Sequence, residues 1–341
     1  MSTRTLRLFA ATTTLAAPLL GLATAASAAT PTTLNSPAAA AIYGNDLFVA
    51  NFYGNSVTEF NASSGAVVRQ LAGPAYKFSE PANIAVEGTH VFVTSNSLPA
   101  ATITEFNAAT GAVENLISGP ATIFSHLSSI TPDGSLVLVT SFYNNAVIEL
   151  DATTGKVLHI LNSPRYGFAR PYSVAVSGKN AFVLNNGANA ISEINVTTGA
   201  LVHFWSYSSA RLNAPNEIAI SGNTLIVTSP ILNAVTEINA TSGAVIRTLS
   251  SASYAFDAPT HLAVSGQNVF VTNGLYGAPS SVSEINIASG ALVHTYRSST
   301  YGFSDPAAIT TLGPLLIVVA ESTNQVQEIN TTSFGLVKTL R

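Results

Sequence analysis

Residues 215–250 read PNEIAISGNTLIVTSPILNAVTEINATSGAVIRTLS, and copies of this segment recur through the chain after residue 36. The segment holds four short apolar runs, IAI, LIVT, AVTEI and AVIRTL, which are rich in Val, Ile and Thr. Runs of this length and composition, bounded by Gly, Asn, Ser and Pro, are typical of β-strands. SGN at residues 221–223 and NATSG at residues 239–243 supply tight turns. Each copy is therefore predicted to be a four-stranded antiparallel meander.

The copies repeat about every 44 residues, which is the spacing of propeller blades. Seven copies fill the chain, with starts at residues 37, 81, 127, 171, 215, 259 and 306. One meander cannot bury both of its faces, because Val235 and Ile238 point to opposite sides of the same strand. Radial repetition gives every sheet a neighbour on either side. The sequence thus predicts an all-β fold, a single seven-bladed β-propeller of four-stranded antiparallel blades over residues 37–341.

The first residues predict export. Residues 1–28 carry two arginines, an apolar run and the small-residue motif ASA at residues 26–28. This order is typical of a secretory signal peptide, with cleavage after Ala28. The apolar run is interrupted by Pro18 and is short for a membrane-spanning helix. We expect a signal peptide at 1–28, a linker at 29–36, and a mature chain that is secreted or extracellular, either free or associated with the cell wall, without membrane insertion.

Composition excludes several classes of function. Charged residues make up 9% of the chain and the formal net charge is −4. A nucleic-acid binder would carry a basic surface, so no nucleic-acid partner is expected. The chain has no cysteine, which excludes disulfides and thiolate chemistry. Stability must therefore come from packing between blades.

The repeated strands also resemble a known family. VFVTN at residues 269–273 is followed by V-x-E-I-N at 282–286, and other copies continue with T-x-G or S-x-G at the next turn. This pattern resembles the secreted YVTN-type β-propeller repeat, a relative of the NHL repeat, and the resemblance covers residues 37–341. It implies the propeller fold. Such propellers serve as wall-associated binding proteins, scaffolds and occasional enzymes, so the resemblance leaves the function open.

A glutamate recurs in the third strand of every copy, and we interpret it as structural because seven equivalent catalytic sites are implausible. These residues are Glu59, Glu105, Glu149, Glu193, Glu237, Glu284 and Glu328. The fourth strand carries a basic residue in six copies and Asn115 in the second. Across a tight hairpin each should lie opposite the glutamate and pair with it. The basic residues are Arg69, His159, His203, Arg247, His294 and Lys338.

An aromatic pair recurs in the loops between copies, at a fixed offset before the next one. A platform for an aromatic ligand is conceivable, but the fixed offset favours packing between adjacent blades. The pairs are Tyr76 and Phe78, Tyr166 and Phe168, Tyr254 and Phe256, and Tyr301 and Phe303.

Functional residues are expected where the copies differ. The first strand of each copy has a small residue at its middle, which places that strand innermost, at the axis. Two residues after each start the copies form a ring at the channel mouth: Ala39, Asn83, Ser129, Ser173, Glu217, His261 and Ala308. A second ring should lie just above it: Asn51, Ser95, Ser141, Asn185, Ser229, Asn273 and Ala320.

Only Glu217 and His261 in these rings are ionisable, and they come from adjacent blades. A histidine beside a carboxylate in a concavity is the minimum equipment for acid–base catalysis. The alternative is that these groups merely solvate a water-filled channel. The predicted ligand-binding residues are Asn83, Ser173, Asn185 and Asn273. A single carboxylate is too few for a hard cation, and no cofactor motif is present, so neither metal nor cofactor is expected.

Two classes of function remain. The first is an exported binding or scaffold propeller that takes a small ligand, a glycan or a protein at its loop face and channel mouth. The second is an enzyme, and it is similar in architecture to streptogramin lyases and propeller lactonases, with Glu217 and His261 acting on a lactone or ester. Insertions at residues 98–100 and 275–279 should border the pocket, since insertions on one face of a repeat array mark the binding face. We also expect the first and last blades to pack directly.

Overall fold

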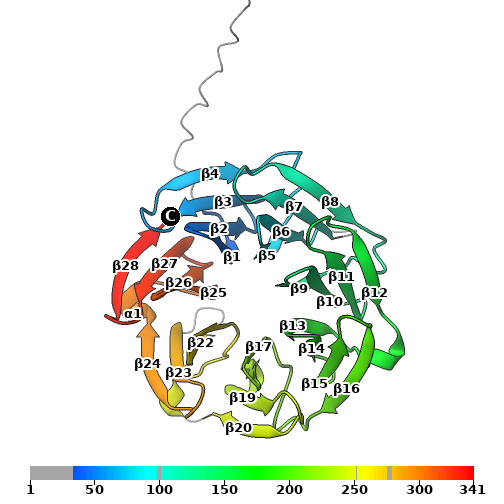
Figure 1. The fold of residues 1–341 in the computed structure, drawn as a ribbon. Coiled ribbons are helices and arrows are strands. Elements are labelled where there is room, and N and C mark those ends of the chain that lie inside the picture. The colour runs from blue at the N-terminus through cyan, green and yellow to red at the C-terminus, as the bar shows by residue number, and fades with distance from the viewer. Residues whose placement is uncertain (1–33, 98–100, 251, 275–278) are drawn as a thin grey trace, which may run out of the picture. The chain divides into compact units, whose positions relative to one another are not determined.

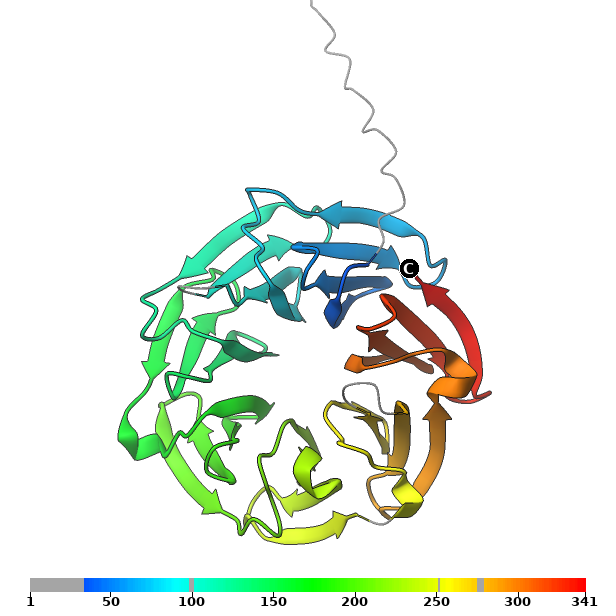
Figure 2. The same cartoon turned by 180° about the vertical axis from the view of Figure 1, so that it is seen from behind.

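Seven four-stranded antiparallel sheets stand radially around a channel in the computed structural model (Figure 1, Figure 2). The structure describes residues 34–97, 101–250, 252–274 and 279–341. All of these belong to one compact unit, Pro31–Arg341. The prediction of an all-β seven-bladed propeller is confirmed. The expected signal peptide, most of the linker and the two loop insertions fall outside the described residues, apart from Pro279.

Each blade consists of four consecutive strands, ordered from the axis outward (Figure 1). The innermost strands are β1 (Pro37–Tyr43), β5 (Pro81–Glu87), β9 (Leu127–Asp133), β13 (Pro171–Ser177), β17 (Ile218–Ser221), β21 (Leu262–Ser265) and β25 (Pro306–Leu312). The second strands are β2 (Asp46–Asn51), β6 (His90–Ser95), β10 (Leu136–Ser141), β14 (Asn180–Asn185), β18 (Thr224–Ser229), β22 (Asn268–Asn273) and β26 (Leu315–Ala320).

The third strands are β3 (Ser56–Asn61), β7 (Thr102–Asn107), β11 (Ala146–Asp151), β15 (Ala190–Asn195), β19 (Ala234–Asn239), β23 (Ser281–Asn286) and β27 (Gln325–Asn330). The outermost strands are β4 (Val67–Leu71), β8 (Val113–Ser118), β12 (Val157–Leu161), β16 (Ala200–Ser206), β20 (Val245–Leu249), β24 (Leu292–Arg297) and β28 (Gly335–Leu340). The described helices are single turns in loops: η1 (Pro164–Tyr166), η2 (Pro230–Leu232), η3 (Ala252–Tyr254) and α1 (Ser298–Tyr301). No helix within the described ranges is both long and apolar enough to cross a membrane.

The core lies between blades rather than within them. Each hydrophobic cluster joins side chains of two neighbouring sheets, and one of them contains Leu47 and Phe60 of blade one with Ile317 and Leu340 of blade seven. Lys338 of the last strand also donates hydrogen bonds from Nζ to the carbonyl oxygens of blade one's third turn, at 2.8 and 2.6 Å. The expected direct packing of the first and last blades is therefore confirmed.

The third-strand glutamates are buried, and the strand register places the fourth-strand residue directly opposite each of them. Five blades show an ion pair there, for example Arg247 Nε to Glu237 Oε2 at 2.7 Å. Blade six differs because His294 stacks on Phe334, with ring centroids 4.2 Å apart. Phe334 has φ = +56° and occupies the place that Gly holds in the third turn of the other blades.

The aromatic loop pairs stack within each loop and fasten it to the following blade. Tyr76 and Phe78 have centroids 5.2 Å apart, and the Tyr76 hydroxyl donates to the Gly111 carbonyl oxygen at 2.7 Å. Tyr166, Tyr254 and Tyr301 make the equivalent bond to the next blade's third turn. The four pairs thus serve packing between adjacent blades.

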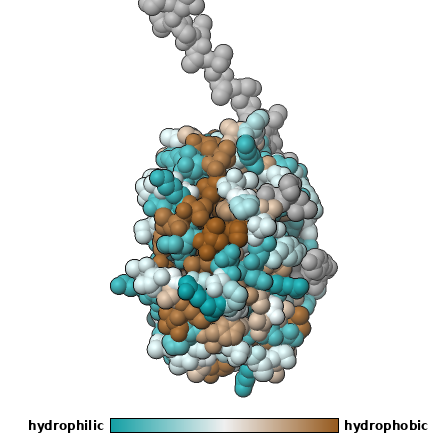
Figure 3. Space-filling view, turned by 90° about the vertical axis from the view of Figure 1, so that its right-hand side faces the viewer, coloured by the Kyte–Doolittle hydropathy of each residue, from teal (hydrophilic) through white to brown (hydrophobic). Residues whose placement is uncertain are grey.

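Exposed aliphatic side chains follow the outer strands around the circumference. Figure 3 shows apolar groups gathered along the outer edge on the side formed by β8, β12 and β16. One such residue recurs at the bulge where each outer strand pairs with the third: Val68, Leu158, Val202, Ile246, Val293 and Val337. Blade two has Glu114 at this place.

Candidate functional site

A cavity of about 590 Å³ lies in the channel and is lined by residues from all seven blades. Its volume falls within the usual range of small-molecule pockets, about 300–1,000 Å³. Every residue of the first predicted ring contributes to its wall: Ala39, Asn83, Ser129, Ser173, Glu217, His261 and Ala308. The wall is unequal around the axis, because blades one and seven contribute mainly Ala while blades two to six contribute the polar side chains.

Glu217 and His261 contact one another across the boundary between blades five and six. His261 Nδ1 lies 3.1 Å from Glu217 Oε2, and the same carboxylate oxygen accepts a hydrogen bond from the Leu262 backbone N–H at 3.1 Å. The side chains are 32% and 29% exposed, so both reach the cavity while being held in place. Among the described residues that line the cavity, Glu217 is the one carboxylate. This is fewer acidic ligands than a hard cation takes.

The backbone at this pair differs from the backbone of the other blades. The innermost strands β17 and β21 begin at Ile218 and Leu262, one residue after the pair, whereas the other innermost strands begin two residues before the ring position. The N–H of Glu217 donates to Thr228 Oγ1 at 3.0 Å, and the N–H of His261 donates to Thr272 Oγ1 at 2.9 Å. Side-chain hydroxyls therefore fix the two ring residues where the regular strand has not yet begun.

Asn83 and Ser173 line the cavity and also tie adjacent blades together. Asn83 Nδ2 donates to the Leu127 carbonyl oxygen of blade three at 2.9 Å and to Thr94 Oγ1 at 3.1 Å. Ser173 Oγ accepts a hydrogen bond from the Ile218 N–H of blade five at 3.4 Å. Each of these side chains therefore makes a hydrogen bond to the next blade in addition to lining the cavity.

Asn185 and Asn273 lie elsewhere. Both are 0% exposed and neither belongs to the cavity wall. Asn185 Nδ2 donates to Ser192 Oγ at 2.9 Å while its Oδ1 accepts from the Ala169 N–H at 3.2 Å. Asn273 makes the matching bond to Ser283 at 3.0 Å. The asparagines of the second ring, Asn51, Asn185 and Asn273, thus donate to hydroxyl groups of the third strand, as buried amides commonly do.

His126 is a wall residue that the ring positions did not include. It precedes the first strand of blade three, and its φ is +53°. Burial lowers the pKa of His126 below its ordinary value of 6.5, so its imidazole is neutral at pH 7. The ring packs against Phe142 and Tyr143, at centroid distances of 5.4 and 5.2 Å.

A signal for His126 was present in the repeat. The residue before each opening position has positive φ in every blade, and it too varies between copies: Ser36, Glu80, His126, Arg170, Ala214, Ala258 and Asp305. Of these seven residues, all within the described part of the chain, His126 is the one that lines the cavity. The cavity thus combines a carboxylate–imidazole pair, a neutral imidazole beside aromatic rings, and a small-residue side.

Comparisons with known proteins give the fold independent support. Hydrazine synthase of Kuenenia stuttgartiensis superposes with a TM-score of 0.71 at 17% identity, over 89% of this chain and 97% of that one. The WD40 domain of Neurospora crassa Pan2 gives 0.60 at 10% identity, over 76% and 78%. BamB from Moraxella catarrhalis gives 0.55 at 15% identity, over 91% and 89%. At these identities the likeness concerns the fold alone.

The sequence itself matches a family model, although no curated protein matches it. The model is described as outer membrane protein assembly factor BamB, and it matches residues 55–227, which is half of the chain. The matched segment runs from the turn before β3 to β18, and so contains the repeated frame of blades two to four. This chain therefore belongs to the family of the outer membrane protein assembly factor BamB.

Proposed function

We propose that this chain is an exported binding propeller that holds a small polar ligand, or a polar group of a partner protein, in the channel cavity. The observation that carries the proposal is the Glu217–His261 contact in the wall of the 590 Å³ cavity. Pockets that recognise ligands combine an apolar wall with a few placed polar groups. Here the alanines of blades one and seven form the apolar wall, and blades two to six supply the polar groups.

The pair is separate from the structural frame. Frame glutamates such as Glu193 are buried and paired with a residue of the same blade, His203, on the outer strand. Glu217 and His261 instead join the inner edges of two blades and remain partly exposed. The frame histidine His203 is itself 51% exposed, so the distinguishing feature is the carboxylate: Glu193 is 5% exposed, whereas Glu217 is 29% exposed and accessible to a ligand.

Export is the second part of the proposal. A signal peptide at residues 1–28 would deliver the chain outside the cytoplasm, whether free or at the cell wall. The name of the family, an outer membrane protein assembly factor, supports an exported protein and a protein partner. The resemblance to YVTN and NHL repeats remains a prediction beside this membership.

The Glu217–His261 contact also favours an alternative, a lyase or lactonase. Glu217 Oε2 accepts from His261 Nδ1, which leaves Nε2 of the imidazole to take a proton from a substrate. A carboxylate that orients a histidine in this way is a common arrangement for a general base. Turnover distinguishes the enzyme from the binding protein.

The experiment is a thermal-shift and turnover screen of a defined panel of lactones, esters, mono- and disaccharides and amino acids. We expect compounds that raise the melting temperature of the wild type to lose this effect in the double variant Glu217→Ala/His261→Ala, whose own melting temperature should stay nearly unchanged. His203→Arg is the matched control, because Arg occupies the same frame position in blades one and five. Binding that survives in the double variant but is lost on substitution of third-turn residues would place the site on the opposite face.

A further inference from the structure

Blade two departs from the repeated frame at three neighbouring positions. His90 begins β6, at the place where Asn180 and Asn268 of blades four and six donate to their own third-strand glutamates at 2.7 and 2.6 Å. Glu114 replaces the exposed aliphatic residue at the outer-strand bulge, and Asn115 replaces the basic partner of the frame glutamate. The replacements bring together one imidazole and two carboxylates.

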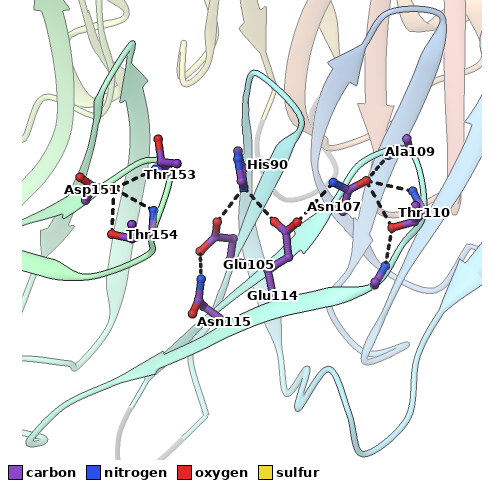
Figure 4. Close-up of polar contacts among 11 residues, drawn as sticks. His90, Glu105, Asn107, Ala109, Thr110, Glu114, Asn115, Asp151, Thr153 and Thr154 are labelled. Atoms are coloured by element: carbon purple, nitrogen blue, oxygen red, sulfur yellow. Dashed lines mark hydrogen bonds and ion pairs between the residues drawn. The ribbon is translucent and has the colours of Figure 1, made fainter.

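The three groups converge on one point, as Figure 4 shows. His90 Nδ1 lies 2.8 Å from Glu105 Oε1 and 2.8 Å from Glu114 Oε2. The ligand atoms all lie within 4.8 Å of one another. An imidazole nitrogen carries at most one hydrogen, so it cannot donate to both carboxylates.

The geometry directs the hydrogen of His90 to Glu114, because only that contact has hydrogen-bond geometry. Glu105 Oε1 is therefore left without a hydrogen-bond donor, although the Glu105 side chain is 0% exposed and faces the cluster. Carboxylate oxygens without a donor also occur at Glu149, Glu237 and Glu328, so blade two is distinguished by the imidazole nitrogen and the second carboxylate that lie beside this oxygen. A cation bound among the three groups would compensate the buried charge.

Each carboxylate accepts a hydrogen bond from an asparagine amide on its other oxygen. Asn115 Nδ2 donates to Glu105 Oε2 at 2.8 Å, and Asn107 Nδ2 donates to Glu114 Oε1 at 3.3 Å. Hydrogen bonds to the far oxygen of a carboxylate are the usual second shell of a metal ligand. His90 and Glu114 are partly exposed, at 22% and 31%, which gives an ion a path from solvent.

We propose that His90, Glu105 and Glu114 form a site for a divalent transition-metal ion, with Zn²⁺ as the representative ion. One imidazole and two carboxylates suit Zn²⁺, which takes three protein ligands and a water in open sites. Ca²⁺ and Mg²⁺ prefer six or more oxygen ligands and are a poorer fit. The ion would join β6, β7 and β8 of blade two.

The site is distinct from the channel cavity. Asn96, which follows the last residue of β6, lines the cavity, whereas His90 is the first residue of that strand. The absence of a metal was expected from the channel rings, and this cluster belongs to neither ring. The repeat alone does not indicate this cluster, because Glu105 is one of seven equivalent glutamates in the sequence.

The test uses the full chain, purified without an affinity tag and stripped with EDTA, with Zn²⁺ alone as the probe. We expect one Zn²⁺ per chain by titration calorimetry and by elemental analysis after dialysis. His90→Asn installs the residue of blades four and six and keeps a donor to Glu105, while Glu114→Val installs the residue of blades one, four, six and seven. Each should weaken Zn²⁺ binding by more than about 100-fold, the upper range for loss of a supporting residue.

His159→Arg is the control, since it changes another frame histidine to the residue of blades one and five and should bind Zn²⁺ as the wild type does. Circular dichroism establishes that each variant is folded, and tetrahedral absorption of bound Co²⁺ gives a second measurement on the wild type. The proposal is overturned if the wild type binds no Zn²⁺, or if both variants bind it with unchanged stoichiometry and affinity. The proposal is also overturned if His159→Arg no longer binds Zn²⁺, since the ion would then bind at the His159–Glu149 pair.

Discussion

Gly243 and Gly222 offer a matched test of how closely neighbouring blades pack at their turns. Both glycines have positive φ, +68° and +56°. A Cβ at Gly222 would meet nothing within 4 Å, whereas a Cβ at Gly243 would lie 2.5 Å from ring atoms of Trp205 in the preceding blade. The two Gly→Ala substitutions therefore share the backbone cost and differ in the steric one.

The expected magnitudes follow from these two costs. An L-residue in the left-handed region costs about 1–2 kcal/mol, and the lower entropy of the unfolded chain offsets about 0.4–1 kcal/mol of this. Gly222→Ala should thus lower the free energy of unfolding by about 1 kcal/mol. Overpacking adds about 1–3 kcal/mol, so Gly243→Ala should lower it by about 2–4 kcal/mol.

The assay is guanidinium unfolding followed by circular dichroism and by intrinsic fluorescence. Trp205 is the only tryptophan of the chain, so native-state emission reports directly on the displaced ring. We expect a changed emission maximum in folded Gly243→Ala and an unchanged one in folded Gly222→Ala. Equal losses of stability in the two variants, or unchanged emission in Gly243→Ala, would refute the argument. That argument is that the turn between the third and fourth strands packs closely against the preceding blade.

Two further predictions concern ring closure and pH. Lys338→Met should lower the free energy of unfolding by about 1–3 kcal/mol, because it removes hydrogen bonds from a charged donor to blade one and leaves the carboxylate of Glu328 buried without its cation. Denaturant midpoints measure this against Lys156→Met, an exposed control, and equal effects would contradict it. Burial raises the pKa of the Glu149 carboxyl above its ordinary 4.5, although His159 has a lowering effect. The stability that this carboxyl contributes is therefore fully present below pH 4.5 and is lost as the pH rises through the folded-state pKa. The loss is at most about 1.4 kcal/mol per pH unit. Glu149→Gln should flatten that dependence in midpoints measured from pH 4.5 to about pH 8, and an unaltered slope would count against it.

The fold could be predicted because the signals for it are local and repeated. Turn residues at fixed offsets, strand-length apolar runs and a small residue at the middle of each innermost strand all recur seven times. The contact between Glu217 and His261 could be predicted for the same reason, since equivalent positions of adjacent blades must be neighbours around the axis. In a repeat protein, positions that align between successive copies are therefore neighbours in space.

The surroundings of individual residues could not be predicted where repetition ends. Asn185 closes a second strand, and only the backbone of the preceding loop shows that its amide turns into the sheet to satisfy the Ala169 N–H. His294 keeps the predicted register but stacks on Phe334, a residue that departs from the Gly of the other third turns. His126 was missed because its position depends on a positive φ that the side chain does not specify.

The ring of seven wall positions has a consequence for how such a protein changes over evolutionary time. Ala, Asn, Ser, Glu and His all occupy this position in one chain, while the glutamates, turn glycines and loop tyrosines that hold the blades together occupy different places. Asn83, Ser173 and Glu217 also make a hydrogen bond to the next blade, so a change at the wall has a local cost but leaves the repeated contacts of the frame in place. Each blade thus offers one position at which ligand chemistry can be exchanged without replacing the glutamates, turn glycines and loop tyrosines that hold the blades together.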